Sequence, residues 1–264
     1  MTSAWRSLLR LAALLLLAAL ALQLYFLARV ALMIVLDPQS TTFQRSEIWR
    51  LVSEQHQLLW SQQWVGYERI ADPLKRAVIA SEDANFAEHS GVEWDALEKA
   101  WERNQRAEQR IDKINEQLDR RAARNGKAAA SNNPRPVVHA QPKVVGGSTI
   151  TQQLAKNLFL GGERSLARKG QEFVITFMLE ALLGKQRILE IYLNNVEWGE
   201  GIFGADAAAR HYFHVGAGGL GATQSAQLAV MLPAPKRFEK RPGSAYVVGR
   251  AATVVARMSA VEIP

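Results

Sequence analysis

The chain has 264 residues, which is enough for an N-terminal anchor and one domain of about 200 residues with its own core. It contains no cysteine, which excludes disulfides and cysteine-ligated metal sites. The net charge of +7 suits an anionic partner, either a nucleic acid or a phospholipid-like surface. No nucleic-acid-binding signature accompanies this charge, so we expect no nucleic-acid partner.

Residues 8–36 are almost wholly apolar and predict a transmembrane anchor, since a spanning helix needs about 20 residues. The interruptions are Arg10, Gln23 and Arg29. A cleaved signal peptide ending near residues 19–21 is the alternative, but the apolar run continues well past that point. Basic side chains precede the span and Asp37 follows it, so the positive-inside rule places residues 1–7 in the cytoplasm and residues 37–264 outside it.

Residues 40–66 are amphipathic and contain three tryptophans, Trp49, Trp60 and Trp64. Tryptophans in such a segment fit a lipid headgroup layer and core packing equally well. The sequence leaves both alternatives open.

A helix is predicted from Asp72 onward, with Asp72 as a possible cap and Pro73 in the first turn. It carries Glu82 near its C-terminal end, on a partly apolar face. A carboxylate there should be held less comfortably as an anion, which favours a proton acceptor near neutral pH. The alternatives are a solvated helix end for Glu82 and a hydrogen-bonded structural role for His89.

Residues 102–124 are densely charged and helical in composition, with a short apolar stripe at Ile111, Ile114 and Leu118. Residues 126–142 are rich in small residues and proline and predict a mobile linker. We therefore expect a charged helical and mobile insertion at about residues 102–145.

Residues 146–172 combine two glycines and Ser148 with a helical pattern. Ile150, Leu154 and Leu158 share one face, and Ser148 is the expected N-cap. A helix N-terminus after glycines is a natural anion site, and nearby bases favour phosphate or pyrophosphate. Those bases are Lys156, Arg164, Arg168 and Lys169. The alternative is a simple glycine turn with an N-cap.

The rest of the chain reads as a series of helices. Ser165 can cap a long helix whose expected buried side is Phe173, Phe177 and Ala181. Helical patterns follow at 185–195, 201–213, 222–232 and 246–260. Strand signals are nearly absent, so the domain should be mostly α.

Five motifs in order give a more specific expectation: EDANFAEHSG, GGSTITQQLAKNLFL, RKGQE, KQRILEIYLNNVEWG and LAVMLPAPKRFEKRP. From about Ile70 to the C-terminus, outside residues 102–145, the chain resembles the peptidoglycan glycosyltransferases of glycosyltransferase family 51. It is most similar to their monofunctional Gram-negative branch, because no transpeptidase motifs follow. The departures are the long insertion, and Gln224 and Gln227 near a position where relatives often carry glutamate.

The resemblance implies a lysozyme-like, mostly α glycosyltransferase domain (residues 37–264) with a small lobe against the membrane. It implies polymerisation of lipid II into β-1,4 glycan with inversion, Glu82 acting as the base and Glu172 as the second catalytic carboxylate. The bases Lys156, Arg164, Arg168 and Lys169 would hold the donor pyrophosphate. Ser148, Thr149, Gln152 and Asn157 would line the groove. Asp83, Phe86, His89, Tyr192 and Asn194 would shape or support it.

The same resemblance implies a single-pass protein of the bacterial inner membrane with its domain in the periplasm. Its partners would be lipid II, the growing glycan strand and the membrane, with other cell-wall synthesis or division proteins as candidates. No cofactor is expected to be required, although Mg or Mn could assist the pyrophosphate. Two rival hypotheses are a lysozyme-like hydrolase or lytic transglycosylase, and a non-enzymatic membrane-anchored scaffold.

Overall fold

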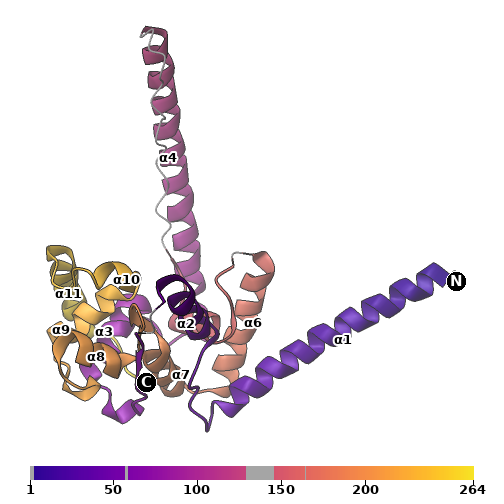
Figure 1. The fold of residues 1–264 in the computed structure, drawn as a ribbon, viewed down its shortest axis with the longest axis horizontal. Helices are drawn as coiled ribbons and strands as arrows, with labels where there is room; N and C mark the ends of the chain where they lie inside the picture. Colours follow the sequence, from indigo (N-terminus) through magenta and orange to yellow (C-terminus); the bar gives the residue numbers. More distant parts are fainter. Residues whose placement is uncertain (1–2, 57–58, 129–145, 164) are drawn as a thin grey trace. The chain divides into compact units, whose positions relative to one another are not determined.

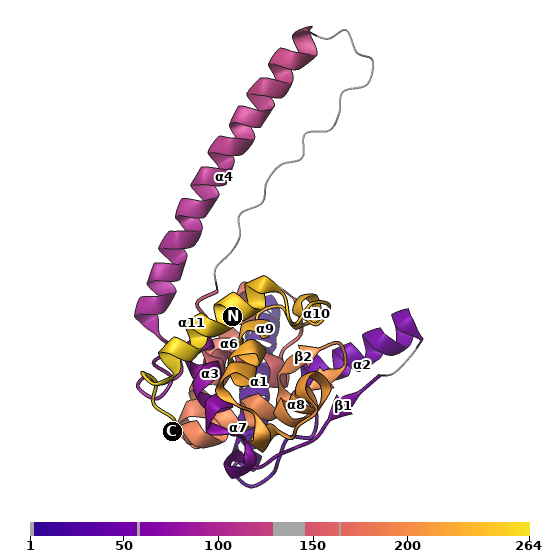
Figure 2. The same ribbon diagram turned by 90° about the vertical axis from the view of Figure 1, so that its left-hand side faces the viewer.

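The computed structural model describes residues 3–56, 59–128, 146–163 and 165–264. The chain forms two compact units, one made of Met1–Val92 with Thr149–Pro264 and the other of Glu93–Ser148. Helices dominate the described residues of both units (Figures 1 and 2), so the mostly α fold predicted from the sequence is confirmed.

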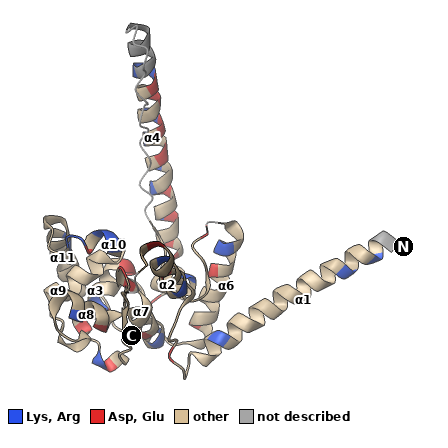
Figure 3. Cartoon of the chain, in the orientation of Figure 1, with Lys and Arg blue, Asp and Glu red and all other residues tan. Residues whose placement is uncertain are grey.

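The first helix, α1 (Ser3–Leu32), is long and apolar enough over residues 5–32 to cross a membrane. Most of its large apolar side chains are exposed, and Figure 3 shows it free of acidic residues along its described length. Its C-terminal third differs, because Phe26, Val30 and Met33 are buried in the domain core. The helix ends with a turn through Leu36.

The next segment places its three tryptophans in different surroundings, and core packing is confirmed for Trp60 and Trp64. Helix α2 (Thr42–Gln55) starts with a capping box at Thr41 and presents Trp49 with 75% of its surface exposed. Trp60 stacks on Phe203 with 4.5 Å between ring centroids. Trp64 packs against the core.

The core of the larger unit is built from helices that pack in two groups. Helices α3 (Asp72–Glu82), α9 (Ala222–Met231) and α11 (Ala245–Met258) contact one another. Helix α5 (Ile150–Phe159) contacts α2, α6 (Leu166–Leu182) and α7 (Lys185–Asn195). The shorter helices are α8 (Ala205–Phe213), α10 (Pro235–Phe238), η1 (Tyr67–Arg69) and η2 (Ala217–Gly219). Gln224 caps its own helix, since its side-chain oxygen accepts from the Gly221 amide at 3.0 Å.

A small sheet with strand order β1-β3-β2 joins distant parts of this unit. Strand β1 (Ser61–Gln62) is parallel to β3 (Ile202–Phe203), and β2 (Glu197–Gly199) is antiparallel to β3. The turn between β2 and β3 requires Gly201, whose φ is +72° and where a Cβ would meet the Leu59 carbonyl oxygen at 1.9 Å.

The predicted helix faces are confirmed in α5 and wrong in α6. Ile150, Leu154 and Leu158 are all buried, as their spacing predicts. In α6, Ile175 and Leu179 are buried, whereas Phe177 of the predicted buried side is 47% exposed. The predicted stripe of Phe173, Phe177 and Ala181 therefore faces away from the protein core, and the opposite side of α6 packs against it.

The second unit contains α4 (Trp94–Ala128), which starts earlier than the charged segment predicts. Its exposed surface carries both signs of charge (Figure 3), with ion pairs such as Glu102 to Arg106 at 3.0 Å. Such i,i+4 pairs support a solvated helix. The predicted linker lies mostly outside the described residues, from residue 129 onward.

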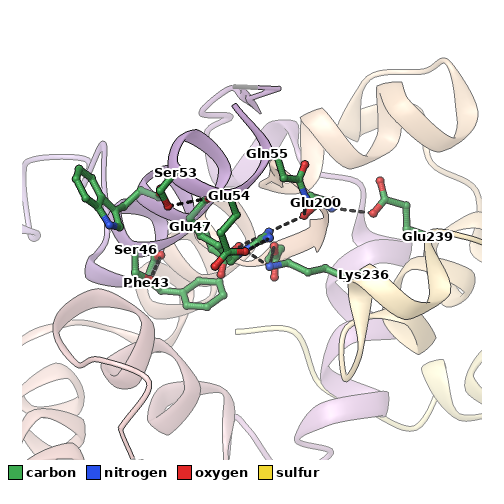
Figure 4. Close-up of polar contacts among 12 residues, drawn as sticks. Phe43, Ser46, Glu47, Ser53, Glu54, Gln55, Glu200, Lys236 and Glu239 are labelled. Atoms are coloured by element: carbon green, nitrogen blue, oxygen red, sulfur yellow. Dashed lines mark hydrogen bonds and ion pairs between the residues drawn. The ribbon is translucent and has the colours of Figure 1, made fainter. Parts of the chain in front are cut away.

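A polar cluster connects α2 to the β2–β3 turn and to α10 (Figure 4). Arg50 binds Glu200 at 2.6 Å and Glu47 at 3.0 Å. Lys236 pairs with Glu47 and lies 3.4 Å from Glu197. Glu197 is buried, and burial raises its pKa to about 7 although Lys236 opposes this.

The raised pKa of Glu197 predicts a pH-dependent cost in stability. The folded protein holds this proton more tightly than the unfolded chain, so stability falls as pH rises from about 4.5 to about 7. Glu197→Gln should remove that cost and raise the free energy of unfolding at pH 8 by about 1–3 kcal/mol, with little change at pH 4.5. Denaturant titrations at both pH values would measure this.

Glu200→Gln is the matched control, because Arg50 lowers the pKa of Glu200. The ionised form of Glu200 therefore stabilises the fold, whereas the ionised form of Glu197 destabilises it. This control should lose stability at pH 8. A loss of stability at pH 8 in Glu197→Gln as well would contradict the prediction.

Candidate active site

Glu82 is the last residue of α3 and is half-buried at the start of a hydrogen-bonded chain. Its Oε2 accepts from Gln153 Nε2 at 2.9 Å, and Gln153 Oε1 accepts from the Tyr192 hydroxyl at 2.9 Å. Burial, helped by the neighbouring carboxylates, raises the pKa of Tyr192 well above its usual value, so the phenol remains a neutral donor. A donating phenol turns the amide oxygen of Gln153 toward itself and the amide nitrogen toward Glu82.

The environment of Glu82 suits a proton acceptor. Burial raises its pKa above 4.5; the Gln153 hydrogen bond and Lys156 counteract this in part, and Asp83 adds to it. A carboxylate of raised pKa is a stronger base than a solvated glutamate. This matches the chemistry expected of Glu82 from its place on the helix.

The N-terminus of α5 is closed by protein groups, which corrects two expectations. The N-cap is Thr149 and not Ser148: Thr149 Oγ1 accepts from the Gln152 amide at 3.2 Å, and Gln152 Oε1 accepts from the Thr149 amide at 3.1 Å. This frame places Gln152 at the third helical position, where a capping box requires Glu or Gln. The expected anion site is occupied by Asp83, whose Oδ2 accepts from the Ile150 amide at 3.0 Å.

Asp83 thereby connects the end of α3 to the start of α5. Its second oxygen, Oδ1, lies 2.7 Å from His89 Nε2, and the Gly91 amide donates to His89 Nδ1 at 3.1 Å. Both side chains hold the turn after Glu82 in place. Their contribution to the site is to position the carboxylate of Glu82 next to α5.

Glu172 is buried on α6, with 3% of its surface exposed. Its carboxylate pairs with Lys169 and with Arg168, the latter at 3.2 Å. Both bases are half-buried, so this carboxylate keeps two cations in fixed positions next to one another.

Lys156 is influenced electrostatically by both carboxylates. Its side chain is open to solvent, yet surrounding protein lowers its pKa, while Glu172 and Glu82 raise it and Arg168 and Lys169 lower it further. Glu82 on α3 and Glu172 on α6 therefore both act electrostatically on the ammonium group of Lys156.

A pocket of about 300 Å³ opens beside Lys156. It is lined by Phe43, Lys156, Asn157, Leu160, Gly161, Gly162 and Arg168. Arg168 Nε is buried and has no hydrogen-bond partner among the described residues, and the same holds for Gln152 Nε2. The pocket lining combines the charges of Lys156 and Arg168 with the apolar side chains of Phe43 and Leu160, so it suits an anionic ligand with an apolar part.

Other predicted site residues lie in structural positions. Phe86 is fully buried with the Lys185 ammonium 4.6 Å from its ring centroid. Asn194 is buried and binds the Val65 amide and carbonyl at 2.8 and 2.9 Å. Ser148 belongs to the second unit, and Arg164 lies outside the described residues.

Sequence reasoning missed Gln153 and Phe43. Gln153 belongs to the second motif and precedes Lys156 by three residues. On a helix this spacing places the two side chains close together, and this could have identified Gln153 as a site residue. Phe43 had no signal, because it lies more than 100 residues away in the chain and reaches the pocket only through the packing of α2 on α5.

The described residues contain no group of three or more His, Asp or Glu side chains that could hold a metal ion. The pocket presents bases and amides, which do not fit a resident divalent cation.

The chain matches known proteins over most of its length. A family model described as Transglycosylase matches residues 51–127 and 124–259. A "Biosynthetic peptidoglycan transglycosylase" of Burkholderia pseudomallei is 49% identical over 245 residues, which cover 93% of this chain and 83% of the relative. A protein of the same description from Bordetella pertussis is 46% identical over 246 residues, covering 93% of this chain and 90% of the relative.

Proposed function

Since the chain belongs to the transglycosylase family and is a peptidoglycan transglycosylase with a lysozyme-like domain, we propose that its reaction is the polymerisation of lipid II. The growing glycan chain, linked to undecaprenyl pyrophosphate, is transferred onto the 4-hydroxyl of lipid II to form a β-1,4 link with inversion. The observation that carries this proposal is the pocket beside Lys156, whose lining combines the charges of Lys156 and Arg168 with apolar side chains.

In this reaction Glu82 takes the proton of the acceptor hydroxyl. The acceptor oxygen forms a bond to the anomeric carbon of the donor, and the bond from that carbon to the pyrophosphate oxygen breaks. The raised pKa of Glu82 and its hydrogen bond from Gln153 support this role. Attack on the face opposite the leaving group gives inversion, for which a separated pair of carboxylates is suited.

The leaving pyrophosphate needs positive charge more than it needs a strong acid. Lys156, Arg168 and Lys169 supply that charge, and Lys156 and Arg168 line the pocket. Glu172, the second catalytic carboxylate, holds Arg168 and Lys169 toward the donor. Arg164 remains a proposed fourth base, and Asn157 lines the same pocket.

We place the protein in the bacterial inner membrane as a single-pass protein with residues 1–7 in the cytoplasm and its domain in the periplasm. Arg6 and Arg10, in the first turns of α1 before its uncharged run, support this orientation. A retained anchor is supported over a cleaved signal peptide because the apolar run continues well past the alternative cleavage site at residues 19–21.

The proposed partners are lipid II, the growing glycan strand and the membrane, with other cell-wall synthesis or division proteins as candidates. No nucleic-acid partner and no required cofactor are proposed. Mg or Mn could accompany the pyrophosphate without being held by the protein. Polymerisation without peptide cross-linking is proposed because the matched family model is that of a transglycosylase alone.

The experiment that tests the function compares two assays of the purified full-length chain. Lipid II in detergent should yield glycan polymer, and finished cell wall should release no muropeptides. Muropeptide release without polymer would favour the lytic alternative, which needs no pyrophosphate site.

Lys156→Ala should raise the KM for lipid II by about tenfold or more, because it removes one charge that binds the pyrophosphate. The free energy of unfolding should change by less than about 0.5 kcal/mol, since a solvent-exposed lysine contributes little to folding. Steady-state kinetics and denaturant unfolding would measure the two effects. Lys240→Ala, at an exposed lysine outside the pocket, is the charge-matched control. An unchanged KM in Lys156→Ala would move the pyrophosphate site elsewhere.

A further inference from the structure

Two glutamine side chains join the apolar helix α1 to α6, the helix that carries Glu172. Gln23 Nε2 donates to Gln171 Oε1 at 2.8 Å, and Gln171 Nε2 donates to Gln23 Oε1 at 3.0 Å. The pair is half-buried, and each amide donates and accepts within it. A polar side chain in a helix that enters hydrocarbon is costly unless it is paired in this way.

Helix α1 is longer than a membrane requires. Its apolar part spans 28 residues, or about 42 Å at 1.5 Å per residue. A hydrocarbon layer of about 30 Å needs about 20 residues, so roughly eight residues are in excess. Counting about 20 residues back from Gln23 reaches Ala4, next to the start of the helix at Ser3. Arg6 and Arg10 can extend from there to the inner headgroups.

The domain covers one side of the excess residues. Side chains at residues 11–22 are all exposed, whereas beyond Gln23 Phe26, Val30 and Met33 are buried and Leu24, Leu27 and Leu32 remain exposed. The Arg187 guanidinium then fixes the end of the helix through the Met33 carbonyl at 2.9 Å and Asp37 at 2.8 Å. The helix thus changes at Gln23 from exposed on all sides to covered by protein on one side.

Helix α6 also has an exposed apolar face, on the side of the helix away from the protein core. Leu166, Val174 and Phe177 are 92%, 41% and 47% exposed, although all three are apolar. They lie on the helix that holds Gln171 and that packs against α1. A lipid surface continuous with the one around α1 would cover them.

From these observations we propose that the Gln23–Gln171 pair sets the depth at which the domain sits in the bilayer. Gln171 lies between Lys169 and Glu172 in the sequence of α6, so fixing its height fixes the cations of the site at the level of lipid phosphates. Gln23 and Gln171 are therefore positioning residues. This inference rests on the proposed function, because a donor held in the bilayer presents its pyrophosphate at that level.

The first test uses Gln23→Leu, Gln171→Leu and the double variant of the full chain. With lipid II in phospholipid vesicles, kcat/KM should fall at least fivefold in each, and the double variant should fall no further because the pair acts as one unit. With lipid II in detergent micelles, which impose no fixed depth, all three should match the wild type. Gln186→Leu, at an exposed glutamine of α7, is the matched control and should lose nothing in either system.

The second test needs no lipid II and therefore separates this inference from the proposed function. The chain has no cysteine, so Val174→Cys provides a single site for a nitroxide label. Its depth in vesicles, measured by relaxation with oxygen and with a water-soluble nickel complex, should lie at the headgroup boundary and shift when Gln23→Leu or Gln171→Leu is added. An unchanged depth, or equal losses of activity in vesicles and micelles, or no loss in vesicles, would each overturn the proposal. If no chain polymerises lipid II, the proposed function fails while the depth measurement still decides on the pair.

Discussion

Glu82→Gln should lower the rate of lipid II polymerisation by about 10³-fold while leaving the domain folded. Glutamine matches the shape of glutamate and can still accept from Gln153 through its amide oxygen, but it cannot take the proton of the acceptor hydroxyl. The rate that remains would reflect substrate binding and the cations at the pyrophosphate, although Lys156 loses the contribution of Glu82 that raises its pKa.

The same change should not cost stability at neutral pH. Burial raises the pKa of Glu82, so the folded state disfavours its charge and the contribution of this group falls as pH rises above 4.5. An uncharged glutamine avoids that cost, and the unfolding midpoint of Glu82→Gln at pH 8 should equal or exceed that of the wild type. Loss of activity together with unchanged or higher stability is the expected signature of a group kept for chemistry.

The pH profile of the wild type provides a second measurement. Since a base must be deprotonated, kcat/KM should fall as pH drops through the pKa of Glu82, which lies above that of a solvated glutamate. Glu88→Gln, at an exposed glutamate shortly after Glu82, is the control and should keep both the rate and the profile. Normal turnover by Glu82→Gln would assign the base to another residue.

The predictions from sequence succeeded where a single interaction governs the pattern. The apolar spacing of Ile150, Leu154 and Leu158 reports burial against protein, and those side chains are buried. Glu82 was predicted to lie near a helix end on a partly apolar face, and the structure places it there. In both cases the local helix geometry carries the information.

Three predictions failed because the local sequence pattern did not contain the information that decides the structure. They concern the buried side of α6, the N-cap of α5 and the anion site at the start of α5. Phe177 and its neighbours form an apolar stripe in α6, and the stripe does not distinguish a protein core from lipid. The N-cap moved by one residue because Gln152 completes a capping box with Thr149, and Ser148 has no glutamine at the matching position. The anion site at that helix end was already filled by Asp83, a contact across 67 residues that no local motif records.

The site divides its charges between two helices, and this division explains why both carboxylates are needed. Glu82 stands on α3 with an amide donor and an apolar surrounding, while Glu172 stands on α6 with two bases. Lys156 on α5 senses both. One carboxylate is left free to accept a proton, and the other is committed to holding cations.

Glu172→Gln should lower kcat/KM by about 10²–10³-fold, because the bases that meet the pyrophosphate lose the carboxylate that orients them. It should also destabilise the fold by about 1–3 kcal/mol, since Arg168 and Lys169 would lose a buried partner but remain partly open to solvent. Kinetics with lipid II and denaturant unfolding would measure both.

The pH dependence distinguishes this effect from loss of structure. Glu172 is the strongest influence that raises the pKa of Lys156, so its removal should lower that pKa further. Lys156 would then lose its charge at a lower pH, and the activity of Glu172→Gln should decline at alkaline pH values where the wild type is still active.

Glu180→Gln is the matched control, since Glu180 lies on the same helix, is similarly covered and pairs with Lys185 at 2.8 Å, but does not line the pocket. It should lose stability and keep its alkaline profile. If Glu180→Gln reduced activity as much as Glu172→Gln, the loss would come from weakening α6, and the catalytic role of Glu172 would be contradicted.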